Sequence, residues 1–105
     1  MPLVVQPGHI VATPGAIEAV TPERMSRCLR RHLSGDWGCV DTHDKAINDM
    51  AVAHRTRVLS AYPIDPKQPS RGHGANTLWI ITDRGWETTT LLLPSLTPFP
   101  TPFIL

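Results

Sequence analysis

Both cysteines of the chain and two of its five histidines fall in one short stretch, Arg27 to Lys45, with the spacing C-x3-H-x6-C-x3-H. These residues are Cys28, His32, Cys39 and His43. Thiolate and imidazole groups are natural zinc ligands, and four of them can form a closed structural site. The C-x3-H spacing differs from the common zinc motifs, however, and Cys28 lies in an apolar helical stripe, where cysteine usually acts as a small buried side chain. We therefore keep zinc only as an alternative and expect no metal or cofactor.

A second group of residues could cleave RNA without a metal: His32, Arg57, Ser60 and Thr90. By analogy with small toxin ribonucleases, a helical histidine and residues of a following sheet would supply a general base, a general acid and a cation. Each of these side chains also has an ordinary structural role, because threonine, for instance, is simply a good strand residue. The net charge of +1 gives no sign of a nucleic-acid partner, so we expect one only under this alternative.

Tryptophans suggest a different role, because three of them are many for so small a chain. Trp86 lies in the short turn DRGWE, where we expect it to be exposed beside Arg84. Arg71 belongs to a long polar loop that we expect nearby, and Trp37 sits between glycines in the motif GDWG. Exposed tryptophan and arginine are typical of the centres of protein interfaces. The sequence therefore predicts a protein-binding site containing Trp86, Arg84, Trp37 and Arg71, although Trp37 could instead be a lid on the core.

Size and composition limit the other classes of function. With 105 residues, of which 41% are hydrophobic, the chain can form one domain with a single modest core. No apolar run approaches the roughly 20 residues that a membrane helix needs, and the N-terminus lacks the features of a signal peptide. We therefore expect a cytoplasmic protein with no membrane partner and with reduced cysteines.

Local patterns predict an α+β fold, with two helices packed on one face of a small antiparallel sheet of three or four strands. The first helix begins after Thr21 and ends at Gly35, and the second runs to His54 from a cap at Asp41 or Thr42. We expect strands over 56–62, 77–82 and 88–93, a weaker strand or hairpin over 9–13, and a turn or short helix after it. The buried face of the second helix should contain Ile47, Met50 and Ala51. One domain should span 3–94, followed by a proline-rich, disordered or non-native tail over 95–105.

The segments HLSGDWG, RVLSAY, LWIIT and TTTLLLP, in this order, resemble a family of small bacterial proteins encoded mainly on plasmids and integrated elements. Some members are labelled as a type I restriction endonuclease subunit M. The resemblance runs from about Ile10 to Pro94. Cys39 stands where many members have aspartate, and the ending differs completely. A methyltransferase is excluded, because the chain is too short for a methyl-donor domain and has no glycine-rich loop after a strand.

Taken together, the sequence predicts a non-enzymatic accessory protein of a mobile element that acts by binding another protein. The resemblance implies the mobile element, and one concrete form is an inhibitor of a host defence system such as restriction or CRISPR. The alternative is a metal-independent, toxin-like endoribonuclease. A cleft that gathers His32, Arg57 and Ser60 would favour the ribonuclease, whereas a buried His32 and an exposed Trp86 would favour the binding protein.

Overall fold

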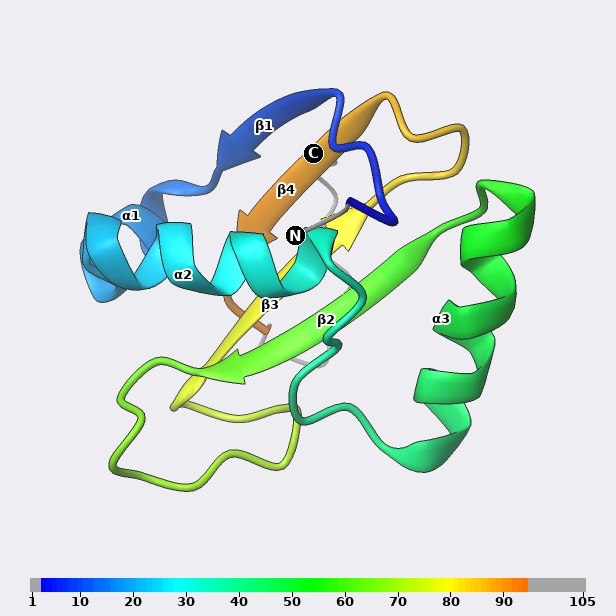
Figure 1. Cartoon of the computed structure of the whole chain (residues 1–105). Helices are drawn as coiled ribbons and strands as arrows, with labels where there is room; N and C mark the ends of the chain where they lie inside the picture. The colour runs from blue at the N-terminus through cyan, green and yellow to red at the C-terminus, as the bar shows by residue number, and fades with distance from the viewer. Residues whose placement is uncertain (1–2, 95–105) are drawn as a thin grey trace.

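The computed structural model describes residues 3–94, and the tail predicted over 95–105 lies outside the described residues. Seven elements follow one another along the chain (Figure 1). They are β1 (His9–Ala12), α1 (Pro14–Ala19), α2 (Pro22–Leu33), α3 (Thr42–His54), β2 (Val58–Pro63), β3 (Thr77–Thr82) and β4 (Thr88–Leu92). Helices and strands are segregated along most of the chain, so the predicted α+β class is confirmed. None of the described helices is long and apolar enough to cross a membrane.

The four strands form one sheet in the order β1-β4-β3-β2. Strands β2, β3 and β4 are antiparallel neighbours as expected, but β1 runs parallel to β4, with His9 opposite Thr88. The sheet is therefore mixed, and the expectation of a purely antiparallel sheet is wrong. The cause is the connection, because β1 reaches its partner after three helices and two strands rather than through a hairpin. The N-terminal run that could have been a hairpin is a single strand entered through Gly8, whose φ is +64°.

Helix α2 has the boundaries that its sequence predicts. Thr21 caps its start, where the hydroxyl oxygen accepts a hydrogen bond of 3.2 Å from the Arg24 backbone N–H. Gly35 follows its end with φ +88°, and the Asp36 N–H then donates to the Arg31 carbonyl at 2.9 Å. This is the left-handed glycine cap expected there, and it turns the chain sharply into the GDWG motif.

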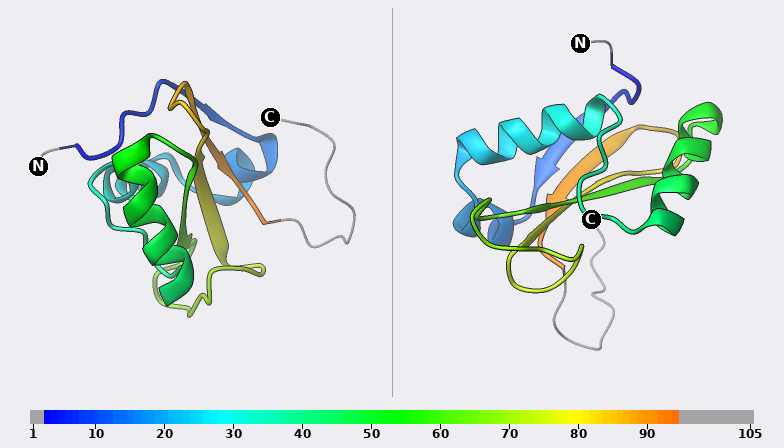
Figure 2. Two further views of the ribbon diagram at one scale, coloured as in Figure 1. Left: turned by 90° about the vertical axis from the view of Figure 1, so that its right-hand side faces the viewer. Right: turned by 60° about the horizontal axis from the view of Figure 1, so that its bottom comes forward.

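Helices α2 and α3 lie on the same side of the sheet, which the left view of Figure 2 shows close to edge-on. The hydrophobic core between the helices and the sheet has two parts. The part under α1 and α2 contains Ala16, Val20, Cys28, Tyr62, Leu78, Ile80 and Leu91. The part under α3 and the β3–β4 turn contains Val5, Leu33, Trp37, Ala51, Val58 and Trp86.

The buried face of α3 differs from the predicted one. Ala51 is buried as expected, but Ile47 and Met50 are 48% and 67% exposed. Asn48 is buried instead, and its side-chain amide binds both the N–H and the carbonyl of Leu59 on β2. These two hydrogen bonds fix the rotation of α3 about its axis, which turns Ile47 and Met50 toward solvent.

Candidate functional site

His32 is the candidate catalytic residue that the structure places most firmly. It belongs to the last turn of α2 and is fully buried against the sheet. Its Nδ1 lies 2.5 Å from the Ser60 hydroxyl of β2, and its Nε2 lies 2.8 Å from the Thr82 hydroxyl of β3. Both ring nitrogens are therefore occupied by side chains of the protein itself.

The hydrogen bonds continue beyond His32 and fix its tautomer. The Thr82 and Thr89 hydroxyl oxygens are 2.7 Å apart, and the Thr89 hydroxyl donates to the Pro7 carbonyl at 2.8 Å. Because a hydroxyl has a single proton, Thr89 must accept from Thr82, and Thr82 must then accept from His32. The Nε2 of His32 is thus protonated, and its Nδ1 accepts from Ser60. Four hydrogen bonds join α2, three strands and the N-terminal segment.

The environment of His32 keeps its ring neutral. Burial lowers the pKa of His32 to about 4, because the charged imidazolium would lose its hydration. A general base for RNA cleavage needs access to a substrate hydroxyl and a pKa near the working pH. His32 has neither, and its hydrogen bonds are those of a buried structural side chain.

The other predicted ribonuclease residues do not join His32, apart from Ser60. Arg57 is exposed and precedes β2. Thr90 is buried, but it pairs with Ile81 on β3, whereas Thr82, the neighbour that binds His32, pairs with Thr89. Since successive side chains of a strand point to opposite faces, Thr90 faces away from His32. The predicted set of four therefore does not form a catalytic site.

The two cysteines and two histidines of the opening motif do not gather into one set of metal ligands. Cys28 is buried in the core, where burial raises the pKa of its thiol. The Cys39 thiol donates to the Ala61 carbonyl at 3.2 Å, and His43 is exposed on α3. Within residues 3–94, no three histidine, cysteine, aspartate or glutamate side chains gather in a way that could hold a metal ion. The regular spacing of these four residues in the sequence therefore does not produce a metal-binding site among the described residues.

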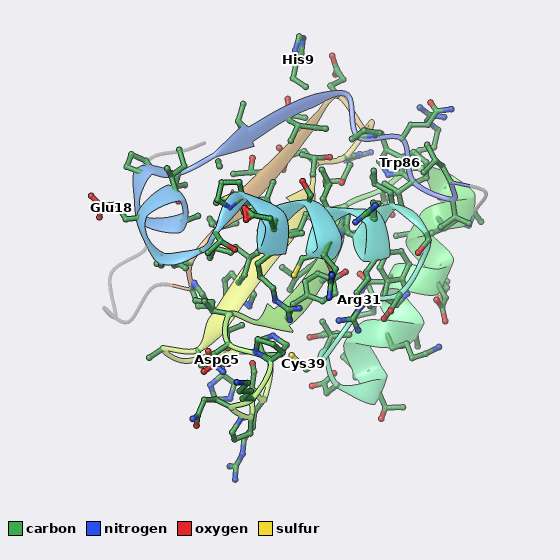
Figure 3. All side chains as sticks on the ribbon, turned by 60° about the vertical axis from the view of Figure 1, so that its left-hand side comes forward. His9, Glu18, Arg31, Cys39, Asp65 and Trp86 are labelled. Atoms are coloured by element: carbon green, nitrogen blue, oxygen red, sulfur yellow. The ribbon has the colours of Figure 1, made fainter. Side chains whose placement is uncertain are left out.

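Trp86 is buried, so the expectation of an exposed anchor is wrong. Only 7% of its surface is exposed, and its indole N–H donates to the Thr56 carbonyl at 3.0 Å. The Arg55 guanidinium covers the ring at 4.8 Å from its centre, as a cation–π contact. Figure 3 shows Trp86 against the body of the molecule, near the end of α3. The β3–β4 turn folds back because Gly85 and Trp86 both have positive φ.

Trp37 is the lid on the core that the sequence allowed as the second interpretation. It is 4% exposed, its ring meets the His32 ring edge-on at 5.9 Å, and its indole N–H donates to Asp49 on α3 at 2.9 Å. Arg84 and Arg71 are exposed, but they lie on different connections, the β3–β4 turn and the β2–β3 loop. The four residues predicted for protein binding therefore do not form one surface.

A different surface combines arginine with exposed apolar side chains. The N-terminal segment and the last turns of α2 enclose a depression of about 680 Å³, which we call the arginine groove. It is lined by Leu3, Arg27, Arg30, Arg31, Ser34, Gly35 and Asp36. Leu3 is 61% exposed at its rim. The sequence contains a signal for this groove, because the arginines at 27, 30 and 31 recur at helical spacing.

Arg31 is the fixed member of the arginine groove (Figure 3). Its guanidinium makes two hydrogen bonds with the Asp36 carboxylate, at 2.7 and 3.2 Å, and lies 4.8 Å from the centre of the Tyr62 ring. The hydrogen bond from Arg31 lowers the pKa of Asp36, and the same contact raises the pKa of Arg31. Asp36 is thus ionised and neutralises Arg31, whereas Arg27 and Arg30 form no ion pair with any residue that the structure describes.

No protein-family model matches the chain, and neither does any curated protein or solved structure.

Proposed function

We propose that this protein is a non-enzymatic accessory protein of a mobile element and that it acts by binding another protein through the arginine groove. The observation that carries this proposal is the pairing of two exposed arginines with an exposed leucine around one depression. Protein interfaces are enriched in arginine and depleted in lysine, and their strongest contacts often involve arginine.

Charge indicates the chemistry of the partner. Arg27 and Arg30 are exposed, and neither forms an ion pair with any residue from 3 to 94. A guanidinium is weakly hydrated and binds carboxylates through two parallel hydrogen bonds. The groove therefore suits an acidic protein surface that also offers an apolar side chain to Leu3.

The biological setting of this binding comes from the resemblance of the sequence to proteins of plasmids and integrated elements. Such elements must survive the defences of the cell that they enter. An inhibitor of restriction or CRISPR interference is the form of the proposal that we favour, and it places the protein in the cytoplasm.

Affinity capture tests the groove directly. The tagged chain would be incubated with a host lysate, and retained proteins would be identified by mass spectrometry. We expect an acidic protein that is retained by the wild type and lost with the Arg27→Glu/Arg30→Glu variant. The matched control is Arg84→Glu, which reverses an exposed charge in the β3–β4 turn and should retain the partner. Equal retention by all three proteins would contradict the proposed role of the groove.

A cell-based assay tests the inhibitory form of the proposal. Unmodified plasmid DNA would be introduced into a restriction-proficient host that expresses the protein. The proposal predicts more transformants with the wild type than with Arg27→Glu/Arg30→Glu, and no difference between them in a host without the restriction system. A CRISPR-bearing host with a targeted plasmid provides the parallel assay. If protection is absent from both hosts, the anti-defence form is wrong, whereas capture of a partner would still stand.

The ribonuclease alternative has one observation in its favour, the contact between His32 and Ser60. The burial of His32, the low pKa of its ring, the exposure of Arg57 and the placement of Thr90 on the opposite face of the sheet oppose it. Incubation of the purified protein with total RNA, with and without a chelator, tests this alternative. Cleavage that survives the chelator and disappears in an Arg57→Ala variant of unchanged stability would favour the ribonuclease over the binding protein.

A further inference from the structure

The two edges of the sheet differ in the hydrogen bonds that their outward backbone groups make with the rest of the described chain. At the β2 edge, the Asn48 amide donates to the Leu59 carbonyl at 2.7 Å and accepts from the Leu59 N–H at 3.1 Å. Further along, Cys39 N–H donates to the Ala61 carbonyl at 2.8 Å, and Ala61 N–H donates to the Trp37 carbonyl at 3.1 Å. The outward backbone groups at both positions have partners, so this edge is closed to another strand.

Within the part of the chain that the structure describes, the β1 edge lacks such partners. The N–H groups of His9 and Thr13 donate to the β4 side, to the carbonyls of Glu87 and Leu91. Because backbone groups alternate in direction along a strand, Ile10 and Ala12 point theirs away from β4. Within residues 3–94, β1 pairs with β4 alone. Figure 1 shows β1 at the outer side of the sheet, with no described element beyond it.

The side chains of β1 also lack the features that usually protect an edge. The strand reads HIVA, without lysine, glutamate or proline. Ile10 and Val11 are 50% and 44% exposed. Beside them, an almost entirely apolar depression of about 310 Å³ lies between β1 and α2, lined by Ile10, Val11, Ala12, Pro22, Met25, Ser26, Leu29 and Leu91.

We propose that a second copy of this chain binds the β1 edge, with the two β1 strands antiparallel around a two-fold axis at Val11. This register lets the outward backbone groups of both Ile10 and Ala12 bond to outward groups of the other copy. Ile10 then lies opposite the partner's Ala12, and Val11 lies opposite the partner's Val11. Each large side chain meets a small one on the face that carries the apolar depression, so the strand is complementary to itself.

The pairing joins the two sheets into one and satisfies the exposed backbone edge of both copies. A strand of four residues buries little surface, so we expect an equilibrium between monomer and dimer that depends on concentration. The β1 edge shares no lining residue with the arginine groove. The inference therefore does not rest on the proposed function, and a dimer would leave one groove available on each copy.

Disulfide trapping tests the register. In an antiparallel pair without mutual hydrogen bonds, opposed Cα atoms lie about 4.5 Å apart, a distance that a disulfide can span. A Val11→Cys variant, made in a Cys39→Ser background, should become a covalent dimer on mild oxidation, while Cys28 stays buried. Two controls should stay largely monomeric. They are Ile10→Cys, whose partner position is alanine, and Ile47→Cys, which is equally exposed but lies on α3.

Sedimentation equilibrium of the full chain tests the association without a cross-link. The wild type should shift from monomer to dimer as its concentration rises. Val11→Lys, which places two like charges opposite each other, and Ile10→Pro, which removes an outward N–H, should both stay monomeric. Ile47→Lys should dimerise as the wild type does, and thermal melts should show that all variants are folded.

Two outcomes would overturn the inference: a wild type that stays monomeric at every concentration, or a dimer that Val11→Lys does not weaken. Loss of dimerisation in Val11→Lys with retained capture of an acidic partner would support both proposals separately. A dimer that forms normally while Arg27→Glu/Arg30→Glu retains every partner would support the β1 pairing and contradict the function of the groove.

Discussion

His32 and Ser60 form a buried hydrogen bond of 2.5 Å between the last turn of α2 and the middle of β2. The sequence hypothesis gave these two side chains catalytic roles, and the structure does bring them together. It also encloses them, with both residues fully buried and the second ring nitrogen occupied by Thr82. The contact therefore belongs to the internal framework that holds α2 on the sheet.

The burial of His32 should make stability depend on pH. In the unfolded chain this imidazole takes up a proton below its ordinary pKa of 6.5, whereas the folded protein resists protonation down to about pH 4. The unfolded state thus binds more protons in this window, so the free energy of unfolding falls as the pH is lowered from 6.5 to 4. Denaturant titrations at pH 8 and pH 5 should differ by about 2 kcal/mol from this residue.

Two variants separate His32 from the other titrating groups. His32→Gln should remove this part of the pH dependence, although the variant will be less stable at every pH. His54→Gln, which changes an exposed histidine at the end of α3, should leave the dependence as it is in the wild type. An unchanged pH dependence in His32→Gln would show that the buried imidazole is not the cause.

The hydroxyl chain beyond His32 should be needed for stability rather than for activity. Replacing Thr82 by valine keeps the shape of the side chain but leaves the His32 Nε2–H without an acceptor and removes the hydrogen bond that the Thr89 oxygen accepts. A buried polar group without a partner costs about 1–3 kcal/mol. Urea unfolding should show a loss of this size for Thr82→Val. Thr88→Val, on the half-buried neighbouring strand position, provides the control and should change stability little.

The sequence predicted those parts of the fold that local chemistry determines. Thr21, Pro22 and Gly35 define the ends of α2 because caps act within a few residues. Strand β3 has its predicted bounds, because TLWIIT is β-branched and apolar between polar loops. The pairing of β1 with β4 could not be predicted, since it joins residues about 80 positions apart and leaves only a weak local pattern in the four residues of β1.

The candidate site was harder to predict because its contacts also join residues that are far apart in the sequence. A tryptophan in a polar turn is expected to be exposed. Only the fold shows that the Trp86 indole N–H donates to the Thr56 carbonyl and that the Arg55 guanidinium covers its ring. Asn48 has no apolar signal, yet it is the residue that fixes α3 on β2. The analogy with small toxin ribonucleases brought His32 together with Ser60, but it also included Arg57 and Thr90, and it could not indicate that the His32–Ser60 pair is fully buried.

Trp86 should behave as a core residue in mutagenesis. Trp86→Ala removes a large side chain from the part of the core shared with Val58 and Ala51, so we expect a loss of about 3–5 kcal/mol. Trp86→Phe keeps most of the packing and loses only the hydrogen bond to the Thr56 carbonyl, so it should cost less. Thermal melts would show the difference. A Trp86→Ala variant as stable as the wild type would restore the interpretation of this residue as an exposed anchor.

Gly38 should tolerate no side chain. It has φ +74°, and a Cβ atom built on it would lie 1.9 Å from the Ala61 carbonyl oxygen of β2. Gly38→Ala must therefore push the GDWG turn away from the sheet and disturb the hydrogen bonds of Cys39 and Trp37 to Ala61. Gly74→Ala is the matched control, because its φ is +94° but the added atom meets nothing within 4 Å. Gly38→Ala should lower the melting temperature well beyond the effect of Gly74→Ala.

Asn48 offers a test of how the β2 edge is closed. Its amide is both a donor and an acceptor for Leu59, and the side chain is 3% exposed. Asn48→Asp cannot donate to the Leu59 carbonyl when ionised and buries a charge, so it should cost more stability than Asn48→Ala. Because protonation restores a donor, the difference between the two variants should narrow at low pH. Hydrogen exchange should also show faster loss of the Leu59 amide proton in Asn48→Ala than in Asn48→Asp, because the carboxylate of the latter can still accept from the Leu59 N–H. The Ala61 amide, which donates to the Trp37 carbonyl, should exchange more slowly than the Leu59 amide in Asn48→Ala. If the Leu59 amide keeps its wild-type protection in Asn48→Ala, the edge is closed by something other than this side chain.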